Sequence, residues 1–499
     1  MTTPTHRRRP RSRRTLLVLA TGVALVAGAV TVSAVGAATP GAATTPSSKR
    51  LHDDFNGDGH PDLAIGAPDS TVGTQAKAGA ISVLYGASTG LATSRKQVLT
   101  WPDRSTSPGR AWYGSALQSA DLDRDGYADL LSLVDTSADT SSTRHLVVNW
   151  GGPKGLSATP TLLKDAPIEY SGAFAVADFD GDRDPDIVTA TDEDPESLGG
   201  GTLVRGPFTR DGAGAGTATF GVIPQEPWRA TGFAAGDVTG DGVADLAVDA
   251  EFLDGDIGTG GTALLVGGSA GFTYKGFLKD AQGRFVRGED IEAGDLNKDG
   301  HADIVVGRTF DDEDADLPAK GGAVIVVYGG PGGASTTRKP VWINQDTAGV
   351  PGAGEWRDGM GSALSIGDTN GDGYQDVVTG LPGEDLEGLT DAGSVLVLRG
   401  SANGLTGTGA RAFTQNTAGV PGTAEQGDRF GAETALLDPD QNKRHSLVVG
   451  DPAENAHNGS VWHFPAPAGG ITASGSTSFG AATLGAPSTR SRFGASLAD

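Results

Sequence analysis

A nine-residue pattern dominated by aspartate recurs six times along the chain and is the clearest source of chemistry in the sequence. Aspartate occupies positions 1, 5 and 9 of each copy, and position 3 is Asp, Asn or Thr. Carboxylates at alternate positions of a tight loop supply the several oxygens, at about 2.3–2.6 Å, that a hard divalent cation requires. The six copies begin at Asp54, Asp121, Asp178, Asp237, Asp295 and Asp368.

The predicted ligands in each loop are the side chains at positions 1, 3, 5 and 9 and the backbone carbonyl at position 7. All these donors are oxygen, and the chain has no cysteine and no clustered histidine, so calcium is favoured over zinc or copper. We therefore expect about six calcium ions. The predicted ligand residues are Asp54, Asn56, Asp58, His60 and Asp62; Asp121, Asp123, Asp125, Tyr127 and Asp129; Asp178, Asp180, Asp182, Asp184 and Asp186; Asp237, Thr239, Asp241, Val243 and Asp245; Asp295, Asn297, Asp299, His301 and Asp303; and Asp368, Asn370, Asp372, Tyr374 and Asp376.

Two other kinds of loop share part of this pattern. An EF-hand ends in glutamate at position 12, whereas these loops carry Ile, Ser, Thr or Val there and run into apolar strands, so an EF-hand is excluded. Aspartate-rich turns can also merely cap their own backbone, but six copies in one register favour metal sites. A seventh copy, beginning at Asp438, is eroded. It has Lys443 where five of the six loops have glycine and Ser446 at the last ligand position, so we expect it to be empty.

The elements around each loop predict an all-β repeat. A strand of small residues leads into the loop, an apolar strand leads out, and a Gly-led strand and a weaker fourth strand follow. Four short strands in roughly 60 residues form one antiparallel blade, and stacked blades bury one another's faces. The chain ends in FGASLAD (residues 493–499), a lead-in strand without a loop, while the loop at Asp54 lacks one. We therefore predict a seven-bladed β-propeller of four-stranded antiparallel blades, closed by the C-terminal strand completing the first repeat.

The loops and the Gly66-Ala67-Pro68 string together resemble FG-GAP repeats. These repeats build the seven-bladed propeller of integrin α subunits and also occur in bacterial secreted proteins. The resemblance covers about residues 52–499. It implies calcium in the aspartate loops and ligand binding on one propeller face, and does not by itself imply an enzyme. The chain departs from the family pattern at Thr239 and in the loop at Asp438.

Composition and the N-terminus restrict the partners and the compartment. The formal net charge of −24 disfavours a nucleic-acid partner, and the absence of cysteine excludes disulfides. Residues 1–38 combine six arginines with an apolar run and small residues, which predicts a signal peptide, followed by a flexible linker at 39–51. The open alternative is an uncleaved membrane anchor. We expect a monomer that is secreted or associated with the cell surface.

Other signals for catalysis are weak. Two G-x-S-x-G strings, at Gly86 and Gly267, lie in turns that do not lead into helices, unlike the turn that carries a hydrolase nucleophile. His60 and His301 occupy position 7 of their loops, so their rings are expected to point outward. The favoured function is an extracellular binding or adhesion module for a protein or glycan. The alternative is an extracellular hydrolase or lyase on a calcium-stabilised propeller.

Two long connectors are near copies of each other, at 344–361 and 414–431. Each joins the outer strand of one blade to the inner strand of the next, so both are expected on the rim opposite the aspartate loops. A shared structural turn would explain the similarity, and so would ligand contact. The side chains offered for contact are Trp356, Arg357, Asp358, Glu425, Asp428 and Arg429.

Overall fold

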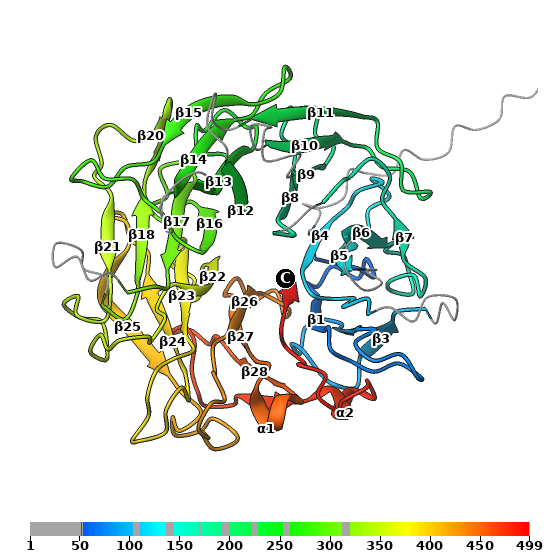
Figure 1. The fold of residues 1–499 in the computed structure, drawn as a ribbon. Coiled ribbons are helices and arrows are strands. Elements are labelled where there is room, and N and C mark those ends of the chain that lie inside the picture. The colour runs from blue at the N-terminus through cyan, green and yellow to red at the C-terminus, as the bar shows by residue number, and fades with distance from the viewer. Residues whose placement is uncertain are drawn as a thin grey trace, which may run out of the picture. The chain divides into compact units, whose positions relative to one another are not determined.

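The computed structural model describes residues 51, 53–102, 110–135, 144–168, 171–191, 200–221, 228–252, 260–311 and 320–498. The predicted signal peptide and nearly all of the predicted linker lie outside these residues. The strands of the described part form seven four-stranded antiparallel sheets around a common axis, with one strand of each sheet at the axis (Figure 1). The predicted seven-bladed all-β propeller is therefore confirmed.

Each blade is a meander in which the first strand lies nearest the axis and each later strand pairs outside the one before it. The second blade contains β4 (Leu117–Ala120), β5 (Asp129–Asp135), β6 (Arg144–Asn149) and β7 (Thr161–Leu162). The third contains β8 (Phe174–Ala177), β9 (Asp186–Thr191), β10 (Gly200–Arg205) and β11 (Gly216–Gly221). The fourth contains β12 (Trp228–Gly236), β13 (Asp245–Phe252), β14 (Gly260–Val266) and β15 (Thr273–Phe277).

The remaining blades repeat this order. The fifth contains β16 (Asp290–Gly294), β17 (Asp303–Arg308), β18 (Ala323–Val327) and β21 (Val341–Ile343), with a small hairpin of β19 (Gly329–Gly330) and β20 (Gly333–Ala334). The sixth contains β22 (Ser362–Gly367), β23 (Asp376–Leu381), β24 (Ser394–Arg399) and β25 (Thr406–Phe413). The seventh contains β26 (Glu433–Leu437), β27 (Ser446–Asp451), β28 (Ser460–Phe464) and β29 (Thr477–Phe479).

The first blade closes the ring with strands from both ends of the described chain. Its order is β3 (Lys96–Thr100), β2 (Ala80–Leu84), β1 (Leu63–Ala67) and β30 (Leu497–Ala498). Ala64 lies opposite Ala498, and the backbone of Gly66 both donates to Ser496 O (2.8 Å) and accepts from Gly494 N (2.9 Å). The C-terminal strand thus supplies the innermost strand that the first repeat lacks, as the sequence predicted.

The middle strands are buried on both faces because neighbouring blades cover them. Every residue of β17 and of β18 is buried, which explains their continuous runs of apolar and β-branched residues. The outer strands face solvent, and β11 alternates between exposed and half-buried positions. The described helices are two four-residue segments, α1 (Glu454–His457) and α2 (Ala481–Leu484), and neither is long and apolar enough to span a membrane.

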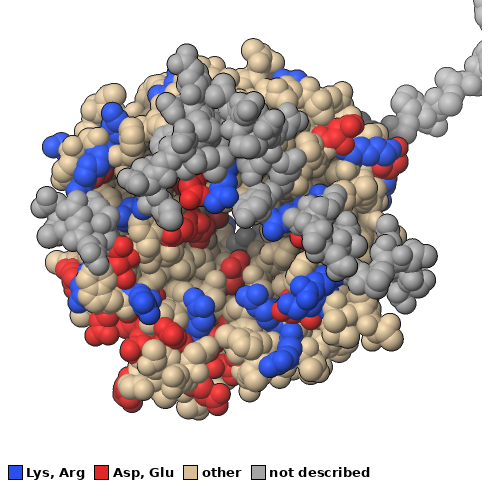
Figure 2. Space-filling view, viewed as in Figure 1, with Lys and Arg blue, Asp and Glu red and all other residues tan. Residues whose placement is uncertain are grey.

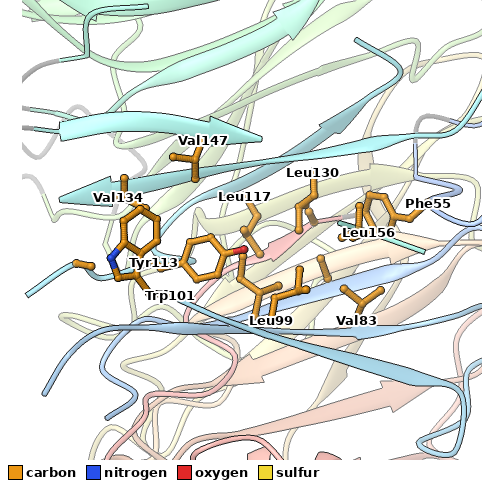
Figure 3. Packing of buried hydrophobic residues seen from close by; sticks show 14 of the residues in the cluster. Phe55, Val83, Leu99, Trp101, Tyr113, Leu117, Leu130, Val134, Val147 and Leu156 are labelled. Carbon is orange, nitrogen blue, oxygen red and sulfur yellow. The ribbon is translucent and has the colours of Figure 1, made fainter. Parts of the chain in front are cut away.

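The hydrophobic core lies between blades. Between the first and second blades, Phe55, Val83, Leu117 and Leu130 pack in one cluster that also includes Trp101 and Tyr113 (Figure 3). The Tyr113 hydroxyl donates to Asn149 Oδ1 at 2.6 Å, which satisfies the one polar atom that this large side chain brings into the core. Stacking of this kind is the reason that a single repeat could not be stable alone.

One buried carboxylate outside the aspartate loops makes stability depend on pH. Burial in β13, together with the nearby Asp290 and Glu289 carboxylates, raises the pKa of Asp249 to about 7, against the hydrogen bond from the Thr262 hydroxyl. Because the folded-state pKa lies above the ordinary 3.8, this carboxyl contributes stability that is complete below pH about 4. That contribution is lost as pH rises through about 7.

We expect Asp249→Asn to remove this dependence. In chelator, wild-type stability should fall by up to about 4 kcal/mol more than that of the variant between pH 4 and pH 8. Urea unfolding of both proteins at the two pH values measures the difference. Equal pH dependence in the two proteins would show that Asp249 stays ionised throughout this range.

Candidate cation-binding loops

The aspartate loops lie at one end of the blades and contact one another. Each of the second to sixth loops connects the innermost strand of its blade to the next strand, and the first loop precedes β1. The backbone N–H at position 8 of one loop donates to the carbonyl at position 1 of the loop before it: Ala128 to Asp54 (2.9 Å), Ala244 to Asp178 (2.9 Å), Ala302 to Asp237 (2.8 Å) and His445 to Asp368 (2.8 Å). Blade stacking and loop geometry are therefore coupled.

Each loop is shaped by its first carboxylate and by a left-handed residue at position 6. In the first loop, Asp54 Oδ2 accepts from Gly59 N at 2.8 Å, and Gly59 has φ of +89°. Glycine adopts this conformation without strain. Arg183 (φ +74°) and Lys443 (φ +67°) hold the same conformation at a steric cost in their loops. The departure from glycine that the sequence showed has therefore not changed the backbone path.

The aspartate at position 9 of each loop anchors the loop to its blade through hydrogen bonds. Asp62 Oδ2 accepts from Phe55 N (2.9 Å), and its Oδ1 accepts from Gly86 N (2.8 Å), beyond the end of β2. Asp129, Asp186, Asp245, Asp303 and Asp376 likewise accept one N–H from their own loop and one from a glycine just beyond the third strand. Burial, together with the charges of Asp54 and Asp58, raises the pKa of Asp62 to about 8, against the backbone hydrogen bonds from Gly86 and Phe55. A bound cation would favour the ionised form of such a carboxylate.

The predicted ligand side chains at positions 1, 3 and 9 converge in the two loops that carry aspartate at position 3. One carboxylate oxygen from each of Asp121, Asp123 and Asp129 lies within 4.8 Å of the others, and the same holds for Asp178, Asp180 and Asp186. The other loops carry Asn or Thr at position 3. Asn297 there is buried, and its Oδ1 has no hydrogen-bond partner in the described part of the chain, as expected of an oxygen available to a cation. The donor set therefore fits a calcium ion.

Arginine side chains form ion pairs with carboxylates in three of the loops. Arg210 Nε lies 2.5 Å from Asp123 Oδ2, Arg205 Nε lies 2.9 Å from Asp180 Oδ2, and Arg399 Nη1 lies 2.7 Å from Asp376 Oδ2. A cation bound in these loops would compete with the guanidinium for the same carboxylates. We therefore expect this competition to lower the affinity of these three loops for calcium.

Two expectations from the sequence are wrong. The histidine rings at position 7 do not point outward: His60 Nδ1 lies 3.0 Å from Pro439 O, and His301 Nδ1 lies 3.1 Å from Val238 O, both in the preceding loop of the ring. Asp358 and Asp428, offered as contact residues on the connectors, are 2% and 3% exposed. Each accepts from the backbone N–H three residues earlier, of Glu355 (2.7 Å) or Glu425 (2.5 Å). The Glu-x-x-Asp spacing shared by both connectors was the signal for this turn.

The eroded seventh loop follows the same backbone path as the other loops but lacks the carboxylate at position 9. Asp438 Oδ2 accepts from Lys443 N at 2.8 Å, as in the intact loops. At the ninth position, the Ser446 hydroxyl donates to Leu437 O instead of accepting two backbone N–H groups. The expectation that this loop binds no metal therefore remains a prediction, supported by the absence of one carboxylate ligand.

An acidic cavity of about 740 Å³ lies on the propeller axis, where Figure 2 shows red side chains around a central hollow. It is lined by residues of the innermost strands, and its carboxylates are Glu289, Asp290, Glu292 and Glu433. The sequence did not predict it, because its lining comes from the innermost strands of several repeats, which meet only when the ring closes.

Comparison with known families matches the same repeats. The FG-GAP repeat family matches residues 52–84 and 360–398, and the FG-GAP-like repeat family matches residues 178–248. These segments fall in the first, sixth, third and fourth of the seven blades. The chain carries FG-GAP repeats on a seven-bladed β-propeller. Its loops at Asp54, Asp178, Asp237 and Asp368 lie within the matched segments.

Curated relatives of this FG-GAP propeller include integrin α subunits. It is 34% identical to human integrin alpha-6 over 119 residues (24% of this chain and 9% of the relative) and 31% identical to mouse integrin alpha-3 over 177 residues (35% and 15%). It is also 30% identical to rat phosphatidylinositol-glycan-specific phospholipase D over 158 residues (30% and 18%). The aligned part is thus less than a fifth of each relative's length. The propeller likeness is shown, and the activities of the whole relatives are not.

Proposed function

We propose that this protein is a secreted, calcium-binding FG-GAP propeller that acts as an extracellular binding module for a protein or glycan. The observation that carries the proposal is the set of aspartate loops, which share one geometry and are joined across blades by hydrogen bonds. The integrin-like relatives and the predicted signal peptide at 1–38 support the extracellular setting. Calcium would rigidify one rim and leave the other rim free to carry recognition loops.

The connector at 344–361 is the proposed recognition element. Its Trp356 is 56% exposed, one of few large apolar side chains so exposed among the described residues. The neighbouring Arg357 has φ of +74°, and its backbone N–H donates to Asp311 Oδ2 at 2.9 Å. This hydrogen bond fixes the backbone that presents the tryptophan and the arginine side by side, and both residue types are enriched in binding hot spots.

We expect Trp356→Ala combined with Arg357→Ala to weaken capture of the ligand at least tenfold, since each hot-spot residue contributes about 1–2 kcal/mol or more. Capture is measured on glycan arrays and from extracellular fractions with wild type, the double variant and a control. Gln426→Ala is the matched control, because Gln426 lies at the position equivalent to Trp356 in the second connector. Calcium content and melting temperature should not change. Normal capture by the double variant would reject this face.

The alternative is an extracellular hydrolase or lyase. Similarity to a phospholipase D supports this second candidate. An activity screen of the purified protein against lipid and polysaccharide substrates, with and without calcium, separates the two functions. Turnover that survives repurification would replace the binding proposal.

A further inference from the structure

A second type of acidic cluster lies at the opposite end of the seventh blade from its eroded loop. Asp428, Asp451 and Glu454 each place a carboxylate oxygen within 4.8 Å of the other two. Asp451 is the last residue of β27, whereas the eroded loop ends at the first residue of that strand. The strand separates the two by roughly 16 Å, given about 3.3 Å per residue. The cluster is therefore distinct from the aspartate loops.

The cluster is enclosed, and it has no positive partner in the part of the chain that the structure describes. Asp451 is fully buried, Asp428 is 3% exposed, and Glu454 is half-buried. Within the described ranges, no lysine, arginine or histidine forms an ion pair with any of the three, unlike the arginine-paired loops. Three carboxylates held together in this way repel one another unless protons or a cation compensate. Burial, followed by its neighbours Glu454 and Asp428, raises the pKa of Asp451 to about 8.

Two buried oxygens at the cluster have no hydrogen-bond partner among the residues that the structure describes. Asp451 Oδ1 accepts from Ala453 N (3.1 Å) and Glu454 N (2.8 Å), but Oδ2 of the same carboxylate has no hydrogen-bond partner among the described residues. Gln415 is 2% exposed, and its Nε2 donates to Glu454 Oε2 at 2.9 Å. Its Oε1 is likewise without a partner in that part of the chain. Buried polar atoms are rarely left unsatisfied without a ligand or water.

The near-copy connector provides a natural comparison. At the sixth blade, Gln345 Nε2 donates to Glu384 Oε2 at 2.8 Å, and Asp358 accepts from Glu355 N, so the scaffold is repeated. Gln345 Oε1 also has no hydrogen-bond partner among the described residues, so the open amide oxygen belongs to the shared scaffold. The residue that corresponds to Asp451 there is Leu381, which is fully buried. The connector therefore folds without a third carboxylate, and Asp451 is an addition to the scaffold rather than a requirement of it.

We propose that Asp428, Asp451, Glu454 and the Gln415 amide oxygen form an additional calcium site that the repeat pattern does not encode. Three carboxylates, able to bind through one or both oxygens, and one amide oxygen supply most of the six to eight donors that calcium takes. The site would give the seventh blade a cation on the rim opposite its eroded loop. It would also fasten the connector at 414–431 to the end of β27.

The test counts ions by equilibrium dialysis and elemental analysis of gel-filtered protein in 1 mM calcium. Wild type should hold about seven ions, and Glu454→Gln and Asp451→Asn each about six. Glu384→Gln is the matched control, because it changes the equivalent glutamine-bonded glutamate in the blade where Leu381 stands in place of Asp451, and it should keep the wild-type count. Glu454→Gln preserves side-chain volume and a hydrogen bond to Gln415, so it also serves if Asp451→Asn does not fold.

The outcomes separate this site from the aspartate loops. If those loops bind nothing, wild type should hold one ion and Glu454→Gln none, and the additional site would still stand. An equal count in wild type and Glu454→Gln would overturn it and assign the buried Asp451 as a protonated acid. Loss of an ion in Glu384→Gln as well would also overturn it, because the effect would then follow from the shared connector scaffold.

Discussion

Removal of divalent cations should lower the melting temperature of this propeller by about 8 °C. With a Kd of about 10⁻⁴ M and 1 mM calcium, each aspartate loop contributes roughly 1.4 kcal/mol, or about 8 kcal/mol for six independent loops. The entropy of unfolding, about 2.1 cal/mol/K per residue, gives about 1 kcal/mol/K for roughly 450 residues. Because backbone hydrogen bonds join four pairs of neighbouring loops, the destabilisation should spread across those blades. Scanning calorimetry with calcium and with EDTA measures it.

Single substitutions assign the effect to the loops. Asp121→Ala removes a ligand from an intact loop, so it should reduce the ion count by one and lower the melting temperature in calcium. Asp438→Ala removes the corresponding residue of the eroded loop and should leave the ion count unchanged. Identical melting in calcium and EDTA, or a crystal structure without ions in the loops at millimolar calcium, would contradict the assignment.

Deletion of residues 493–499 should destabilise the protein by at least about 5 kcal/mol and cause aggregation. The deletion removes Phe493 and Leu497, which are buried against Leu63, Ile65 and the first strands of the seventh blade. It also removes β30, so that β1 becomes an exposed edge of the kind that pairs with other chains. Thermal melting and size-exclusion chromatography of the truncated protein measure the two effects.

A point variant separates closure from packing. Phe493→Ala keeps β30 and its pairing with β1 but removes a ring that packs against Phe479, with centroids 6.2 Å apart. It should cost about 3–5 kcal/mol without aggregation. If the truncated protein melts like wild type and stays monomeric, then the ring does not depend on its C-terminal strand.

Repetition made most of the fold predictable from sequence. The six aspartate loops fix the register of the blades, so the strands on either side of each loop could be placed from their alternation of small and apolar residues. The FGASLAD string at 493–499 predicted closure, because a lead-in strand without its loop has only the unpaired first repeat to join. The left-handed conformation at position 6 also followed from the recurrent glycine.

Only the tertiary structure decided which side chains meet across blades. The imidazole of His60 forms a hydrogen bond with the carbonyl of Pro439, 379 residues away, because closure of the propeller makes the first and seventh blades neighbours. Arg210 reaches Asp123, a contact that no local spacing encodes. The sequence offered Asp428 for ligand contact and gave no motif at Asp451 or Glu454, yet the fold brings the three together where a connector crosses the end of a strand. Periodicity specifies backbone paths, whereas side-chain clusters depend on how separate repeats pack, and that information is not local in the sequence.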